Sequence, residues 1–76
     1  MSKLKLIGAK TMERLLLLGF EKVSQRGSHA FYKHPDGRVT TVPHHMARVL
    51  ARPLIREILR EIEITIDDYN NHLKRL

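Results

Sequence analysis

Apolar residues recur at helical spacing in two stretches of the chain, and each stretch predicts an amphipathic helix. The first covers residues 8–18, and Gly19 after it is expected to end the helix in the left-handed conformation. The second begins at Pro53, because proline suits the first helical position. The predicted buried stripes are Ala9, Met12, Leu15 and Leu16 in the first helix, and Ile55, Ile58, Leu59 and Ile62 in the second.

Between the two helices, three short segments favour the extended state and predict an antiparallel meander. They cover residues 20–25, 29–34 and 38–43. A glycine-containing turn at residues 26–28 separates the first two segments. Residues 34–37 have proline in the second position and glycine in the last, which favours a type I turn before the third segment.

The second of these strands has two chemically different faces, because side chains alternate along a strand. Each face carries one aromatic residue, so the pattern does not show which face is buried. One face consists of His29, Phe31 and Lys33, and the other of Ala30, Tyr32 and His34.

A third helix is predicted near the C-terminus, because Thr65 and Asp68 have the spacing of a helix-capping pair and Tyr69 follows on an apolar face. A three-stranded antiparallel sheet needs cover on one face, and the two flanking helices supply it. The prediction is therefore a two-layer α+β fold in which residues 1–76 form a single domain. Its α-β-β-β-α order, with an extra C-terminal helix, is that of double-stranded-RNA-binding domains.

Composition narrows the class of protein. The chain has 76 residues, of which 42% are hydrophobic, and it has no cysteine, which excludes disulfides and thiolate metal sites. No apolar run approaches the roughly 20 residues that cross a bilayer, and the first residues lack the apolar core of a secretory signal. These features predict a soluble cytoplasmic protein without a membrane partner.

Positive charge is concentrated in the body of the chain. Residues 1–60 contain twelve Lys and Arg against four Asp and Glu, whereas residues 61–76 contain two against four. A cationic body favours a polyanionic partner such as a nucleic acid.

Several short motifs follow one another along most of the chain. They are Gly19-Phe20, Gln25-Arg26-Gly27-Ser28-His29, Tyr32-Lys33-His34-Pro35-Asp36-Gly37, Thr40-Thr41-Val42-Pro43-His44-His45 and Ile55-Arg56-Glu57-Ile58-Leu59. A Gly-Ser-His triplet followed by His-Pro-Asp-Gly and Val-Pro-x-His is specific as a set, although no single piece is. In order and spacing, residues 8–70 resemble the HicA toxin family.

The resemblance implies a toxin of a toxin–antitoxin pair that cleaves messenger RNA without a metal ion and so stops translation. It implies a fold like that of double-stranded-RNA-binding domains and a HicB-type antitoxin that blocks the active face. The histidine of the Gly-Ser-His triplet, here His29, would be the catalytic residue, and no cofactor is implied. The RNA sequence preference and the oligomeric state of the free toxin stay open.

The chain departs from the family pattern at two places. The family usually has Gly followed by Thr or Ser before the second long helix, where this chain has Pro53-Leu54. A hydroxyl that would cap the helix or contact a phosphate is therefore missing. Between the last two helices the family tends to have Ala-Gly, and this chain has Ile62-Glu63.

Histidine suits the chemistry that the resemblance implies. The 2′-hydroxyl of RNA attacks the adjacent phosphorus once a base removes its proton, and free histidine titrates at about 6.5. Cations beside the phosphate stabilise the developing charge. The general acid is left open between water, a second histidine and Tyr32. The candidate substrate-binding residues beside the catalytic His29 are Arg26, Gly27, Ser28, Lys22, Lys33, Arg38 and His45.

Other functions compete with this hypothesis. His34, His44 and His45 invite a zinc site, but their spacing fits no standard site and no metal is expected. The main alternative is a noncatalytic RNA-binding module of the same fold, which would not need a near-neutral base at residues 27–29. A third is a domain whose basic face binds an acidic protein, and RNA cleavage by the isolated chain would separate these hypotheses.

Overall fold

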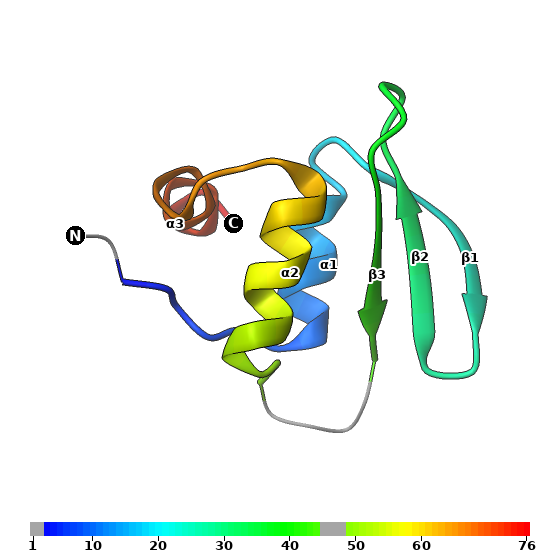
Figure 1. Cartoon of the computed structure of the whole chain (residues 1–76), viewed down its shortest axis with the longest axis horizontal. Coiled ribbons are helices and arrows are strands. Elements are labelled where there is room, and N and C mark those ends of the chain that lie inside the picture. Colours follow the sequence, from blue (N-terminus) through cyan, green and yellow to red (C-terminus); the bar gives the residue numbers. More distant parts are fainter. Residues whose placement is uncertain (1–2, 45–48) are drawn as a thin grey trace.

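The computed structural model of the chain describes residues 3–44 and 49–76 (Figure 1). Among these residues, three helices and three strands follow the predicted order, and the strands form one antiparallel sheet in the order β1-β2-β3. The predicted α+β fold is therefore confirmed, including the C-terminal helix. The elements are α1 (Ala9–Leu16), β1 (Glu21–Arg26), β2 (His29–Lys33), β3 (Val39–Pro43), α2 (Arg52–Ile62) and α3 (Ile66–Lys74).

The elements are arranged in layers. Helices α1 and α2 cover one face of the sheet, and α3 lies beyond them on the side away from the sheet (Figure 1). Within residues 3–44 and 49–76, no helix lies on the opposite face of the sheet. At one end of the sheet, β1 turns into β2, β3 ends, and α1 and α2 begin (Figure 1). We call this the hairpin end, after the β1–β2 turn at residues 27–28.

The helical stripes predicted from apolar spacing form the core. All eight predicted residues are buried, and they pack with the inner side chains of the sheet. Thr40 is the one buried polar residue among those described, and its hydroxyl donates to Glu61 Oε1 at 2.7 Å. The side chains of β2 and β3 that point toward the helices are Ala30, Tyr32, Thr40 and Val42.

The prediction for Gly19 was wrong. Helix α1 ends through Leu17 in the right-handed region, and among the described glycines only Gly27 and Gly37 have positive φ. A Cβ at Gly19 would instead lie 3.4 Å from two ring atoms of His34. This distance is at the short limit of van der Waals contact, and the backbone of Gly19 does not adopt the left-handed conformation. Helix α2 also begins one residue earlier than predicted, at Arg52.

Helix α3 holds the N-terminal segment against the helical layer. Thr65 caps it as predicted, accepting a hydrogen bond from the Asp68 backbone N–H at 3.0 Å. The buried Tyr69 hydroxyl donates to the carbonyl oxygen of Lys5 at 2.5 Å, and Asn70 Nδ2 donates to that of Lys3 at 2.9 Å. Burial raises the pKa of Tyr69 to about 12, so its hydroxyl stays protonated at physiological pH.

Candidate functional site

The Gly-Ser-His triplet lies in the turn between the first two strands. Gly27 and Ser28 form the turn, and Arg26 and His29 are directly opposite each other as the last pair of β1 and β2. Gly27 has a φ of 57°, and a Cβ there would meet no atom within 4 Å. The positive φ, which L residues rarely adopt, is therefore what favours glycine at this position.

The structure decides which face of β2 is buried. Ala30 and Tyr32 point into the core, so His29, Phe31 and Lys33 project from the face that carries no helix. Because opposed residues of an antiparallel pair share a face, Arg26 lies on the same side as His29. The exposed imidazole of His29 and the guanidinium of Arg26 thus start from neighbouring backbone positions on one open surface.

The N-termini of two helices also lie at the hairpin end. Helices α1 and α2 both begin there, and neither has an acidic residue in its first turn or a side-chain cap on its N-terminal N–H groups. Lys10 and Arg52 occupy those first turns. Helix N-termini carry partial positive charge, so this end of the molecule favours anions.

Lys33 shares the open face but not the hairpin end. It is the last residue of β2, four positions from His29, which corresponds to about 13 Å along a strand. It lies opposite Glu21 on β1. Lys33 therefore suits a neighbouring phosphate of a bound strand better than the phosphate next to His29.

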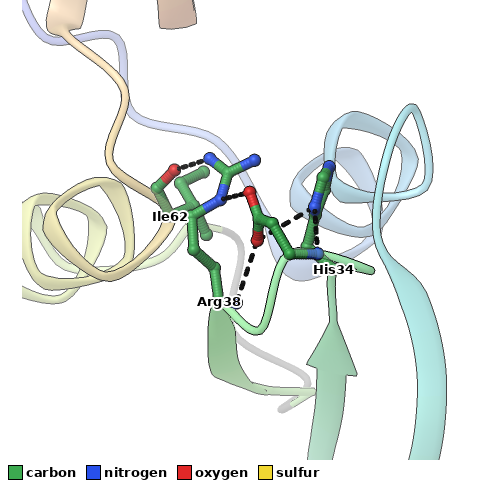
Figure 2. A network of polar contacts seen from close by, with 4 residues as sticks. His34, Arg38 and Ile62 are labelled. Atoms are coloured by element: carbon green, nitrogen blue, oxygen red, sulfur yellow. Dashed lines mark hydrogen bonds and ion pairs between the residues drawn. The ribbon is translucent and has the colours of Figure 1, made fainter.

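Arg38 is engaged far from the hairpin end. Its Nε donates to Asp36 Oδ2 at 2.8 Å, and its Nη1 donates to the carbonyl oxygen of Ile62 at the end of α2 (Figure 2). Its guanidinium also lies 5.3 Å from the ring centre of Phe20. These contacts join the β2–β3 turn to α2. The Arg38 backbone N–H donates a hydrogen bond to Asp36, and this bond is the main cause that holds the pKa of the Asp36 carboxyl below its usual range. The side-chain hydrogen bond from Arg38 lowers the pKa further.

Lys22 lies on the helix-covered side of the sheet. It is directly opposite the buried Tyr32, and its Nζ is 3.5 Å from Glu13 Oε2 on α1. The structure does not bring it to the face that carries His29. The last predicted substrate-binding residue, His45, lies outside the described residues.

A polar cluster that the sequence did not predict connects α1, β2 and the segment after β3. Tyr32 Oη donates to Glu13 Oε2 at 2.8 Å, and His44 Nε2 lies 3.2 Å from Tyr32 Oη. His44 Nε2 is also 3.8 Å from Glu13 Oε2. The sequence offered one signal for this cluster, the position of Tyr32 on the same strand face as Ala30. If that face is buried, the tyrosine hydroxyl needs a polar partner. The identity of that partner depends on how the elements pack.

The cluster alters the acid–base properties of its members. The hydrogen bond from Tyr32 is the main cause that lowers the pKa of Glu13, against an opposing effect of burial, and Lys22 and His44 lower it further. Burial and the Glu13 carboxylate raise the pKa of Tyr32 above its ordinary value. Tyr32 is 1% exposed and its hydroxyl donates a hydrogen bond to Glu13, which argues against Tyr32 as the general acid.

Two histidines considered for zinc lie at opposite ends of the sheet. His34 begins the β2–β3 turn, where its ring packs edge-on against Phe20 at a centroid distance of 5.1 Å, and His44 follows the end of β3. Within residues 3–44 and 49–76, no three His, Asp or Glu side chains gather in a way that would hold a metal ion. The described helices include none that is both long enough and apolar enough to span a bilayer.

Comparison with known proteins agrees with this arrangement. A family model described as the HicA toxin of bacterial toxin–antitoxin systems matches residues 9–64. The match begins with α1 and ends just after α2, so it includes the sheet and the Gly27-Ser28 turn and leaves out α3. Comparison with individual curated proteins finds no match. With the family model covering most of its length, the chain belongs to the HicA family of toxins from bacterial toxin–antitoxin systems.

Proposed function

We propose that this protein is a metal-independent endoribonuclease that cleaves messenger RNA, with His29 as its catalytic residue. The observation that carries the proposal is the position of His29. It is exposed at the end of the β1–β2 hairpin, opposite Arg26 and on the sheet face that carries no helix. A HicA toxin needs an accessible group of near-neutral basicity to activate RNA, and histidine has that property.

In the proposed reaction, His29 removes the proton of a ribose 2′-hydroxyl. The 2′-oxygen then forms a bond to the adjacent phosphorus, and the bond from that phosphorus to the 5′-oxygen breaks. The products are a 2′,3′-cyclic phosphate and a 5′-hydroxyl, whose proton comes from a general acid or water. Positioned base catalysis of this kind contributes about 10² to 10⁴ in rate.

The neighbouring residues bind and orient the phosphates in this proposal. Arg26 contacts the phosphate under attack, where a guanidinium donates two parallel hydrogen bonds. The backbone N–H groups of Gly27 and Ser28 lie next to His29 in the turn. Lys33 binds a second phosphate along the open face. Lys22 and Arg38 are not included in the substrate site, because Glu13 and Asp36 already bind them.

The same surface suits the second partner of the proposal, a HicB-type antitoxin. A protein that neutralises the toxin by covering His29 would dock on the open face of the sheet and the electropositive hairpin end. Acidic side chains on that protein would match Arg26 and the two helix N-termini. Messenger RNA as the substrate would place the activity in the cytoplasm.

The test is cleavage of a messenger RNA by the purified protein in excess EDTA, with the new ends mapped. The wild type should leave 2′,3′-cyclic phosphate ends, and His29→Ala should cleave at least about 100-fold more slowly. His72→Ala is the matched control, because His72 lies on α3, away from the open face. If RNA is bound but stays intact, the protein is a noncatalytic RNA-binding module.

A further inference from the structure

We propose that Glu13, Tyr32 and His44 form a positioning network that holds the Gly27-Ser28 turn, and with it His29, in place for catalysis. This inference rests on the proposed ribonuclease activity. None of the three residues is assigned contact with RNA. Their role is to join the catalytic turn to the packed core through a continuous series of polar contacts.

The first link is a backbone hydrogen bond. The N–H of His44 donates to the carbonyl oxygen of Ser28, one residue before His29. It extends the β2–β3 pairing past its last pair, in which His29 is opposite Pro43. The position of the turn therefore depends on the position of His44.

The second link holds the His44 side chain. Tyr32 Oη donates a hydrogen bond to Glu13 Oε2 at 2.8 Å, which leaves the Tyr32 oxygen free to accept from His44 Nε2 at 3.2 Å. This pattern requires the His44 tautomer that carries a proton on Nε2. Lys22 Nζ, at 3.5 Å, balances the charge of the Glu13 carboxylate. Each donor in the series then has an acceptor.

The third link is the rigidity of the anchor. Glu13 lies in the middle of α1, beside Met12, which is fully buried. Tyr32 is 1% exposed, so its ring has a fixed position in the core. Tyr32 thus belongs to the packed core, and Glu13, which is partly exposed, is held by its place in α1.

The turn lies at an exposed edge of the sheet. All six residues of β1 are exposed, and no atom of the protein lies within 4 Å of a Cβ built on Gly27. A local hydrogen bond also lies at the turn, from Gln25 Nε2 to the carbonyl oxygen of Gly27 at 3.1 Å. A displacement of about 1 Å in a catalytic group costs on the order of 10²-fold in rate, so anchoring the turn affects activity.

The variant that tests the network is Tyr32→Phe, which keeps the buried ring and removes the hydroxyl. We expect kcat for RNA cleavage to fall between about tenfold and 100-fold, with KM changed by less than about twofold. Glu13→Gln keeps an acceptor oxygen for Tyr32 and should retain more of the wild-type kcat than Glu13→Ala. Such rescue by the conservative variant is not expected if Glu13 only contributes charge.

Thr40→Val is the matched control. It removes another polar contact on the inner face of the sheet, between Thr40 and Glu61, toward the end of the sheet away from the turn. It should destabilise the fold by an amount similar to Tyr32→Phe and leave kcat unchanged. If the two variants lower kcat equally, or if neither does, the network does not position the turn.

Amide hydrogen exchange tests the same inference without relying on cleavage. In Tyr32→Phe, the His44 amide should exchange faster than in the wild type, while the amides of Ala30 and Val42 in the β2–β3 pairing stay protected. Unchanged exchange at His44 would overturn the inference. If the wild type cleaves no RNA but His44 responds as expected, the ribonuclease proposal fails and the coupling of this network to the turn stands.

Discussion

At the scale of single residues, Glu63 is the clearest departure from local preference. It ends α2 with a φ of 59° and a ψ of 44°, the left-handed region. Its N–H bonds to Arg60 O, and the N–H of Ile64 bonds to Leu59 O, both at 3.2 Å, which is the Schellman arrangement. The HicA pattern tends to have glycine at this position. The helix therefore ends in the same way here, but with a side chain that disfavours the required conformation.

Glu63→Gly should stabilise the protein. Relief of the left-handed strain is worth about 1–2 kcal/mol, and the greater freedom of glycine in the unfolded chain costs roughly half of that. We expect the free energy of unfolding in urea to rise by about 0.5–1 kcal/mol. Arg56→Gly, in the exposed interior of the same helix, should lower it by about 1 kcal/mol. A loss of stability in both variants would show that the Glu63 side chain itself contributes.

At the same scale, two residues of the same type have different roles. Arg26 and Arg38 look equivalent in the sequence, since both are basic residues at strand ends. One is opposite His29 on the open face, and the other binds Asp36 and Ile62. Composition and strand alternation do not distinguish them, because the difference arises from what packs beside each residue.

At the scale of the elements, the N-termini of α2 and α3 make a natural comparison. Thr65 caps α3 through its hydroxyl, whereas α2 begins after Ala51, which has the same extended conformation and no side-chain hydrogen bond. The hydroxyl that the family pattern has at Pro53-Leu54 would lie in the first turn of α2, because the helix begins at Arg52 and its N-cap is Ala51. The uncapped N–H groups are at the hairpin end, where we propose that phosphates bind.

Opposite changes at the two caps should have opposite effects on stability. Ala51→Ser should raise the free energy of unfolding by about 1 kcal/mol, and Thr65→Ala should lower it by a similar amount. Urea denaturation of both variants at neutral pH gives the two values. Ala51→Ser adds no charge and lies outside the proposed substrate site, so RNA affinity should stay close to that of the wild type.

The elements are also the scale at which prediction from sequence worked best. The apolar spacing of α1 and α2, the Gly27 and Gly37 turns and the capping residue Thr65 were all predicted, because each depends on residues a few positions apart. The left-handed helix end predicted at Gly19 was wrong. The helix ends through Leu17 in the right-handed region, and a Cβ at position 19 would lie 3.4 Å from the ring of His34, fifteen positions away.

At the scale of the whole molecule, charge and fold together create one electropositive surface. The hairpin end combines Arg26, the N-termini of α1 and α2 with Lys10 and Arg52, and the open face of the sheet. The β2–β3 turn, at the opposite end of the sheet, is less positively charged, because Asp36 there forms an ion pair with Arg38. A polyanion should therefore approach the molecule from the hairpin end.

The salt dependence of RNA binding tests this orientation. Replacing Arg26 by Gln in the His29→Ala background should weaken binding of single-stranded RNA. It should also reduce the slope of log affinity against log salt by about 0.7, the value for one phosphate contact. Arg38→Gln should instead lower the free energy of unfolding and leave the slope unchanged. The reverse result would move the RNA contact to the other end of the sheet.

The amino-acid sequence by itself determined the element order, the buried stripes of the helices, the turn residues and the place of His29 beside a glycine turn. These follow from periodicities and turn preferences that act over a few residues. Only the tertiary structure decided which face of β2 is open, that Lys22 and Arg38 are bound elsewhere, and that Glu13, Tyr32 and His44 meet. The physical reason is that the contacts of Glu13 with Lys22 and Tyr32, of Tyr32 with His44 and of Arg38 with Ile62 join residues 9 to 24 positions apart. Such contacts depend on how whole faces pack.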